Sequence, residues 1–195
     1  MQRFLDYVQK RYNYTDYQIK IIRYFFMCMG SDCSKLLIIL GFSAIIGRFL
    51  PCIVALAALV LLRTSGGGFH CERYITCLLF SFAFTFGAIF LAEYIKLIYF
   101  IAILSMLLSL VVAYILVPIV SYHRPEPPKE LIKHSRIINF CFLIFCTFAV
   151  AVFHNNPYCI LLTWVCILHT VQLLLAYFCR KGGKYHVSVF NGTYT

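Results

Sequence analysis

The chain has 195 residues, of which 62% are apolar and only 12% are charged, and its formal net charge is +10. Soluble domains average about 45–50% apolar and about 25% charged residues. A chain of this length cannot bury such an apolar excess in its own core. The composition therefore excludes an ordinary soluble domain and indicates a membrane protein. The basic charge does not indicate nucleic-acid binding, because Lys and Arg lie between the apolar segments, where the positive-inside rule places them.

The N-terminal part is expected to form an amphipathic helix followed by a helical hairpin. Residues 1–35 mix apolar and aromatic residues with six Lys or Arg, which is typical of a helix lying in the membrane interface. Residues 36–62 are apolar but are interrupted by Gly47-Arg48-Phe49-Leu50-Pro51. An arginine at mid-bilayer is costly, and proline removes a helix hydrogen bond.

Each arm of this hairpin has about a dozen residues, which extend about 18 Å and fall short of a ~30 Å crossing. We therefore predict a shallow or re-entrant hairpin over residues 36–62. A single tilted span is the alternative, and it would place residue 70 on the outer side.

Four further segments are predicted to cross the bilayer, which takes about 20 apolar residues. They are residues 77–92, 97–117, 137–153 and 158–179. Connections rich in Lys and Arg belong on the cytoplasmic side. Residues 119–136 hold four of these cations and 179–195 hold three, whereas 93–96 hold one and 154–157 hold none. Both termini and residues 63–76 are therefore predicted to be cytoplasmic.

The predicted fold class is all-α: a polytopic helical membrane protein with four principal spans, an N-terminal amphipathic helix and the hairpin. The 195 residues are expected to form a single domain. A catalytic loop at 63–77 precedes the four spans at 77–179, and a cytoplasmic tail follows at 180–195.

The glycine-rich loop 63–77 carries the candidate catalytic residues, His70 and Cys77. A thiol nucleophile needs a base that takes its proton and later returns it to the leaving amine. In one straight helix these two residues would lie about 10.5 Å apart along the axis, whereas proton transfer needs about 3 Å. Either the three glycines Gly66–Gly68 let the chain fold back, or a second copy of the protein supplies one partner.

The helix that starts near Cys77 is expected to assist the thiol. If Thr76 caps this helix, Cys77 lies in its first turn, where the helix dipole favours an anion. Ser81, one turn further on, shares that face and is a candidate to bond the thiolate or the substrate. The amides of Gly67 and Gly68 are candidate oxyanion donors.

Four other residues leave alternatives open. Arg63 either holds a substrate carboxylate, orients the loop, or is an ordinary interfacial cation. Glu72 either orients the catalytic histidine or is a solvated carboxylate. Asn139 is a candidate third member of a catalytic triad. His169, inside a predicted span, is expected to serve only in packing.

The residues Arg63, Gly68, His70, Cys77 and Ser81, set between two apolar segments, resemble the pattern of the AgrB family of accessory gene regulator peptidases. These bacterial membrane enzymes mature quorum-sensing peptides, and the resemblance extends over nearly the whole chain. It implies that His70 and Cys77 are the catalytic pair and that Arg63 and Gly68 matter for activity. One departure is Cys71, where members usually carry a small residue. This second thiol is the alternative nucleophile.

The resemblance also implies a substrate and a reaction. The partner would be an AgrD-like propeptide, whose C-terminal tail is cleaved through a thioester on Cys77. An internal Cys or Ser of the peptide then closes a thiolactone or lactone ring. The enzyme would lie in the bacterial plasma membrane with its active site cytoplasmic, as a homodimer, and without a cofactor or metal.

Two other functions compete with this interpretation. A small transporter or channel would need ionisable residues along its pathway, and the predicted spans contain very few. A metal-dependent membrane protease would use His70, Cys71, Glu72 and Cys77 as ligands, but the chain has no HExxH motif and the spacing fits no closed zinc site.

Overall fold

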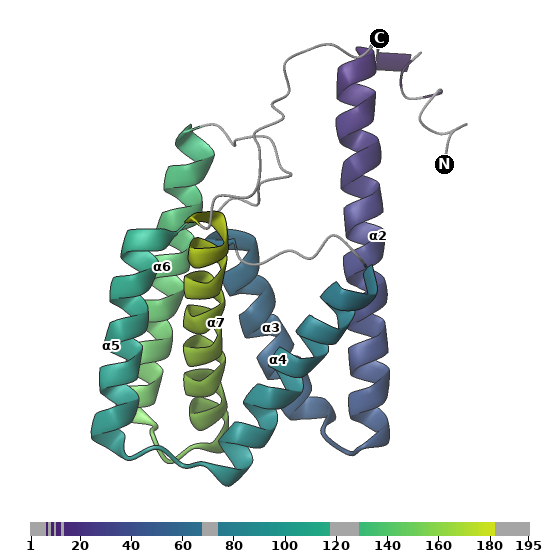
Figure 1. The fold of residues 1–195 in the computed structure, drawn as a ribbon. Helices are drawn as coiled ribbons and strands as arrows, with labels where there is room; N and C mark the ends of the chain where they lie inside the picture. The colour runs from purple at the N-terminus through teal and green to yellow at the C-terminus, as the bar shows by residue number, and fades with distance from the viewer. Residues whose placement is uncertain are drawn as a thin grey trace. The chain divides into compact units, whose positions relative to one another are not determined.

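The computed structural model describes residues 7, 9, 11–12, 14–67, 74–117 and 129–181. The helices of these residues are α2 (Asp16–Ile45), α3 (Phe49–Gly66), α4 (Tyr74–Tyr94), α5 (Tyr99–Leu116), α6 (Lys129–Val152) and α7 (Pro157–Lys181) (Figure 1). The predicted all-α class is confirmed. The chain divides into two compact units, Met1–Phe49 and Leu50–Thr195, which are described separately.

The first unit contains α2, whose two ends are closed by local hydrogen bonds. At the start, the Thr15 hydroxyl accepts from the Gln18 amide at 3.3 Å, and the Gln18 side chain accepts from the Thr15 amide at 2.9 Å. This reciprocal pair is a capping box. At the other end, Gly47 has a φ of 71°, and the Arg48 amide donates to the Ser43 carbonyl at 2.8 Å. These are the marks of a Schellman turn, and they place the predicted interruption at Gly47.

The border expected at residue 35, between an amphipathic helix and a hairpin arm, is not present. α2 runs without interruption from Asp16 to Ile45, because no proline lies between these positions to break it. Within the helix, Lys35 forms an ion pair with Asp32 at 3.1 Å.

The helix at the predicted second arm is longer than expected. α3 has 18 residues, which extend about 27 Å at 1.5 Å per residue. The expected arm length of about a dozen residues is therefore wrong, because the helix continues past Arg63 to Gly66. Pro51 lies in the first turn of α3, where the backbone amides have no intrahelical partner to lose.

Five of the described helices are long and apolar enough to cross a membrane. Four of them are α4, α5, α6 and α7, which correspond to the four predicted principal spans, and the fifth is α3. Whether α3 crosses the bilayer or re-enters it stays a prediction.

In the second unit, α5, α6 and α7 pack against one another and α4 packs against α7. Figure 1 shows α4 tilted relative to α5, α6 and α7. Small residues allow the close contacts, as expected between membrane helices. Ala55 and Ala58 of α3 are buried, as are Ala102 and Ala113 of α5. Large apolar side chains face outward, where lipid is their natural environment; examples are Phe100, Tyr114, Ile115, Phe145 and Phe148.

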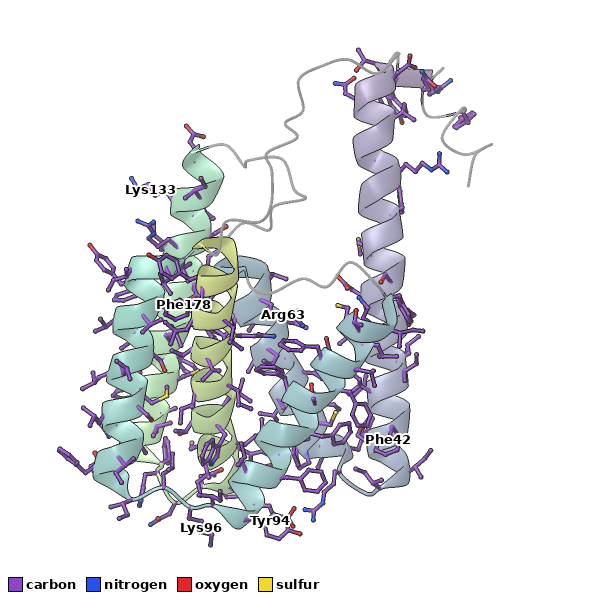
Figure 2. The ribbon with its side chains drawn as sticks, viewed as in Figure 1. Phe42, Arg63, Tyr94, Lys96, Lys133 and Phe178 are labelled. Carbon is purple, nitrogen blue, oxygen red and sulfur yellow. The ribbon has the colours of Figure 1, made fainter. Side chains whose placement is uncertain are left out.

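At each of the two ends of this unit, a side chain donates a hydrogen bond to a backbone carbonyl that follows a helix. Trp164 donates to the Ile95 carbonyl at 3.0 Å, and Arg136 donates to the Val117 carbonyl at 2.9 Å. Figure 2 shows Lys96 at the first end and Lys133 at the opposite end. Helix ends leave carbonyls without intrahelical partners, so these bonds help to define where α4 and α5 stop.

Gly47→Ala should destabilise the end of α2 by about 1–2 kcal/mol, because a Cβ is strained at positive φ. Gly41→Ala is the matched control. Gly41 lies inside α2 with open space around its Cα, so alanine should stabilise the helix by about 0.5–1 kcal/mol. Hydrogen exchange at the Gly47 and Arg48 amides of the purified protein, measured beside a thermal melt, tests this. Equal effects of the two substitutions would contradict the Schellman assignment.

Candidate active site at the ends of α3 and α4

Four of the six predicted site residues are described by the structure. Arg63 lies in the last turn of α3, and Gly67 directly follows that helix. Cys77 and Ser81 lie in the first two turns of α4. The predicted loop 63–77 is therefore helical at both of its described ends, since α3 continues to Gly66 and α4 includes Tyr74 to Cys77.

His70 and Gly68 lie outside the described residues, as do the alternatives Cys71 and Glu72. The catalytic pairing of His70 with Cys77 consequently stays a prediction. The same holds for the oxyanion role of the Gly68 amide.

Cys77 lies near the start of α4, and its catalytic role stays a prediction. α4 begins at Tyr74, so Thr76 lies inside the helix and the prediction that it is the cap is wrong. Cys77 is still in the first turn, where backbone amides have no intrahelical carbonyl to bond and the dipole favours an anion. Its thiol is free of any disulfide, and the residue is only 8% exposed.

A hydrogen bond joins the end of α3 to α4 close to this thiol. The Arg63 guanidinium donates to the Ser81 hydroxyl at 3.1 Å, and Figure 2 shows Arg63 on α3. Ser81 follows Cys77 by four residues, so the two share one face of α4. The last turn of α3 is therefore tied to α4 at one helical turn from the thiol.

Gly67 ends α3 in a conformation that suits glycine. Its φ is 76°, in the left-handed region that other residues enter only with strain. Its amide donates to the Arg63 carbonyl at 3.0 Å. In this conformation the amide is engaged by α3 and does not act as an oxyanion donor.

Asn139, the candidate third member of a triad, bonds the same end of α3. Its Nδ2 donates to the Leu62 carbonyl at 3.2 Å and to the Ser65 hydroxyl at 3.1 Å. The residue is only 1% exposed. Asn139 therefore connects α6 to the last turn of α3.

His169 of α7 reaches this cluster, although the sequence analysis expected it to serve only in packing, and Gln172 lies one helical turn further along α7. His169 is 1% exposed and Gln172 is fully buried. A Cβ on Gly66 would lie 2.8 Å from Asn139 Nδ2 and 3.2 Å from His169 Nε2. The side chains of Asn139 and His169 therefore both lie against Gly66. Polar residues within spans usually face the bundle interior, which is the signal that would have grouped them.

Asn139 is only partly satisfied by its bonds to Leu62 and Ser65. Its Oδ1 is buried without a hydrogen-bond partner among the described residues. Such an atom costs about 1–3 kcal/mol, so apolar packing would be the less costly choice at this position.

The described part of the chain contains no group of three His, Cys, Asp or Glu residues suited to hold a metal ion. The sequence model of one family, AgrB (Accessory gene regulator B), matches residues 1–173. The match includes α2 to α6 and most of α7, together with every predicted site residue. No curated protein and no solved structure matches the chain.

Removing the bond between Arg63 and Ser81 should destabilise the contact of α3 with α4. A hydrogen bond to a charged group contributes about 1.5–3 kcal/mol. Ser81→Ala and Arg63→Met should therefore have effects on unfolding that fall short of additivity by about that amount when combined. Denaturant unfolding of the four members of this double-mutant cycle in micelles measures the coupling. Additive effects would show that the two side chains do not interact.

Proposed function

This chain belongs to the AgrB (Accessory gene regulator B) family, and we propose that it is a cysteine endopeptidase that matures an AgrD-like propeptide. Family membership and the five apolar helices make it a multi-pass membrane protein that takes part in processing the quorum-sensing autoinducing peptide. One observation carries the finer proposal. Cys77 lies in the first turn of α4, and Ser81 on the same face is bonded to Arg63 at the end of α3.

The proposed reaction begins with proton transfer from Cys77 Sγ to the His70 imidazole. The thiolate attacks the carbonyl that precedes the propeptide tail, and the carbon–nitrogen bond breaks as His70 returns the proton to the leaving amine. The tail departs, and the remaining peptide is held as a thioester on Cys77. An internal thiol or hydroxyl of the peptide then attacks that thioester and closes the ring, and the Cys77 thiol is restored.

The surroundings of Cys77 favour ring closure over hydrolysis. Exchange of one thioester for another is nearly thermoneutral, so exclusion of water decides between the cyclic and the linear product. Cys77 is only 8% exposed, and the helix that carries it is mostly apolar. A dehydrated thioester is consistent with this position.

The chemistry is proposed to take place on the cytoplasmic side, in a homodimer. The orientation rests on the basic residues of 119–136 and of the C-terminal tail, which the positive-inside rule assigns to the cytoplasm. The dimer rests on the family resemblance and on the spacing of His70 and Cys77, which a second copy would also resolve.

The described ionisable residues of the apolar segments do not line a transport pathway. Glu93 and Lys96 are exposed at the end of α4, and Arg48 lies at the turn between α2 and α3. Only His169 is buried within a span. A pathway for ions or protons normally has several such groups along it.

Cys77→Ser should abolish cleavage of the propeptide, because a serine hydroxyl in this setting lacks the nucleophilicity of a thiolate. His70→Ala should slow cleavage by about 10²–10⁴-fold, the usual contribution of a general acid–base. Cys71→Ala is the matched control and should retain activity. Mass spectrometry of propeptide incubated with purified enzyme in nanodiscs measures the products. Retained activity in Cys77→Ser together with loss of activity in Cys71→Ala would identify Cys71 as the nucleophile. Loss of activity on adding a chelator would indicate a metal-dependent mechanism.

The two ends of the second unit should differ in their access to membrane-impermeant reagents. Lys96→Cys is expected to react with an impermeant maleimide in intact cells, whereas Lys133→Cys should react only after the cells are permeabilised. Both positions are exposed. The unsubstituted protein gives the background from its own cysteines. Labelling of Lys133→Cys in intact cells would place the active site outside and refute the proposed orientation.

A further inference from the structure

The last turn of α3 is held by side chains from three other helices. Arg63 reaches Ser81 on α4. From the other elements, Asn139 of α6 bonds the Leu62 carbonyl, and His169 of α7 lies against Gly66. The turn itself is buried at Leu62, Ser65 and Gly66.

The contact of Asn139 and His169 with α3 depends on the absence of a side chain at Gly66. A Cβ there would lie 2.8 Å from Asn139 Nδ2 and 3.2 Å from His169 Nε2. Real Cβ atoms essentially never approach as closely as the first distance. Positive φ is found at Gly47 and Gly67 but not at Gly66, so glycine is required at position 66 for space and not for backbone conformation.

We infer that Asn139 and His169 are positioning residues for the proposed peptidase: they clamp the glycine end of α3 and so fix the point at which the chain leaves the helix. The inference rests on the proposed function, because the proposed base His70 lies only four residues after Gly66 in the sequence. A clamp at the end of α3 restricts the positions that the proposed base His70 can reach. The bond of Arg63 to Ser81 fixes the same end of α3 relative to α4, which carries Cys77.

The buried polar side chains favour a positioning role over a purely structural one. Asn139 Oδ1 is buried without a hydrogen-bond partner among the described residues, and the His169 ring is 1% exposed. Apolar side chains at these two places would pack α6 and α7 without that cost. Polar groups inside a membrane bundle usually serve function, and here the groups they contact belong to the helix end that leads to the proposed base.

The test combines a structural and a kinetic measurement on the full-length enzyme in nanodiscs. Asn139→Ala should raise hydrogen exchange at the amides of Gly66 and Gly67, because the end of α3 loses its partner. It should also lower kcat for propeptide cleavage while KM changes little. Misplacement by about 1 Å costs on the order of 10²-fold in rate, so kcat should fall by between about tenfold and a hundredfold.

Gly66→Ala should disturb the same contact by a change on α3 instead of on α6. Its Cβ displaces Asn139, and kcat should fall by a similar factor. In the double variant, the shortened side chain at position 139 leaves room for the new methyl group. The double variant should therefore match Asn139→Ala within about threefold instead of showing the product of both effects. Gly87→Ala is the matched control, since its Cβ meets only Leu168 Cδ1 at 4.0 Å, and its kcat should equal that of the wild type.

The outcomes separate the clamp from the proposed function. Unchanged exchange in Asn139→Ala would refute the clamp. Increased exchange with unchanged kcat, or multiplicative losses in the double variant, would show that the contact is structural only and would overturn the inference. Failure of the proposed function would be detected separately, as cleavage that persists in Cys77→Ser. In that case, hydrogen exchange at Gly66 and Gly67 still tests whether Asn139 holds the end of α3.

Discussion

Asn139 donates hydrogen bonds to the Leu62 carbonyl and to the Ser65 hydroxyl at a place where the bundle excludes water. In such a setting a polar side chain keeps its partners because no solvent competes for them. The end of α3 is consequently fixed by directional bonds and not by apolar packing alone. Directional bonds fix the orientation of the helix end as well as its distance from α6. The proposed peptidase would need this precision where the chain leaves α3, whereas a helix that only faces lipid would not.

The same helix end is linked to the thiol-bearing helix through Arg63 and Ser81. Arginine suits this link because its long apolar stem packs along α3 while its guanidinium reaches across to the hydroxyl. α6 and α7 thus act on the site through α3, and α3 acts on α4. Cys77 lies one helical turn before Ser81 on α4.

Most of the fold followed from local patterns, and most of the site did not. The apolar segments identified α4 to α7, and Gly47 marked the turn after α2. The length of α3 was missed because Arg63 looked like the end of an apolar segment, whereas its bond to Ser81 allows the helix to continue.

The cluster at Gly66 was missed for a different reason. Asn139 and His169 are separated from it by many residues and lie on different helices. Periodicity and composition report on neighbours within one element, and only tertiary packing brings these three together. α4 begins at Tyr74 and not at Cys77 as expected, because the sequence pattern alone leaves helix boundaries open by a few residues.

The two adjacent glycines at the end of α3 constrain how the sequence can evolve. Gly67 is needed for its φ of 76°, so a residue that tolerates the left-handed region, such as asparagine, is its nearest substitute. Gly66 is needed for its volume, so its replacement is harmful until position 139 has first become smaller. Because shortening residue 139 alone is also expected to lower kcat, either order of substitution passes through an impaired intermediate, and positions 66 and 139 are expected to change together.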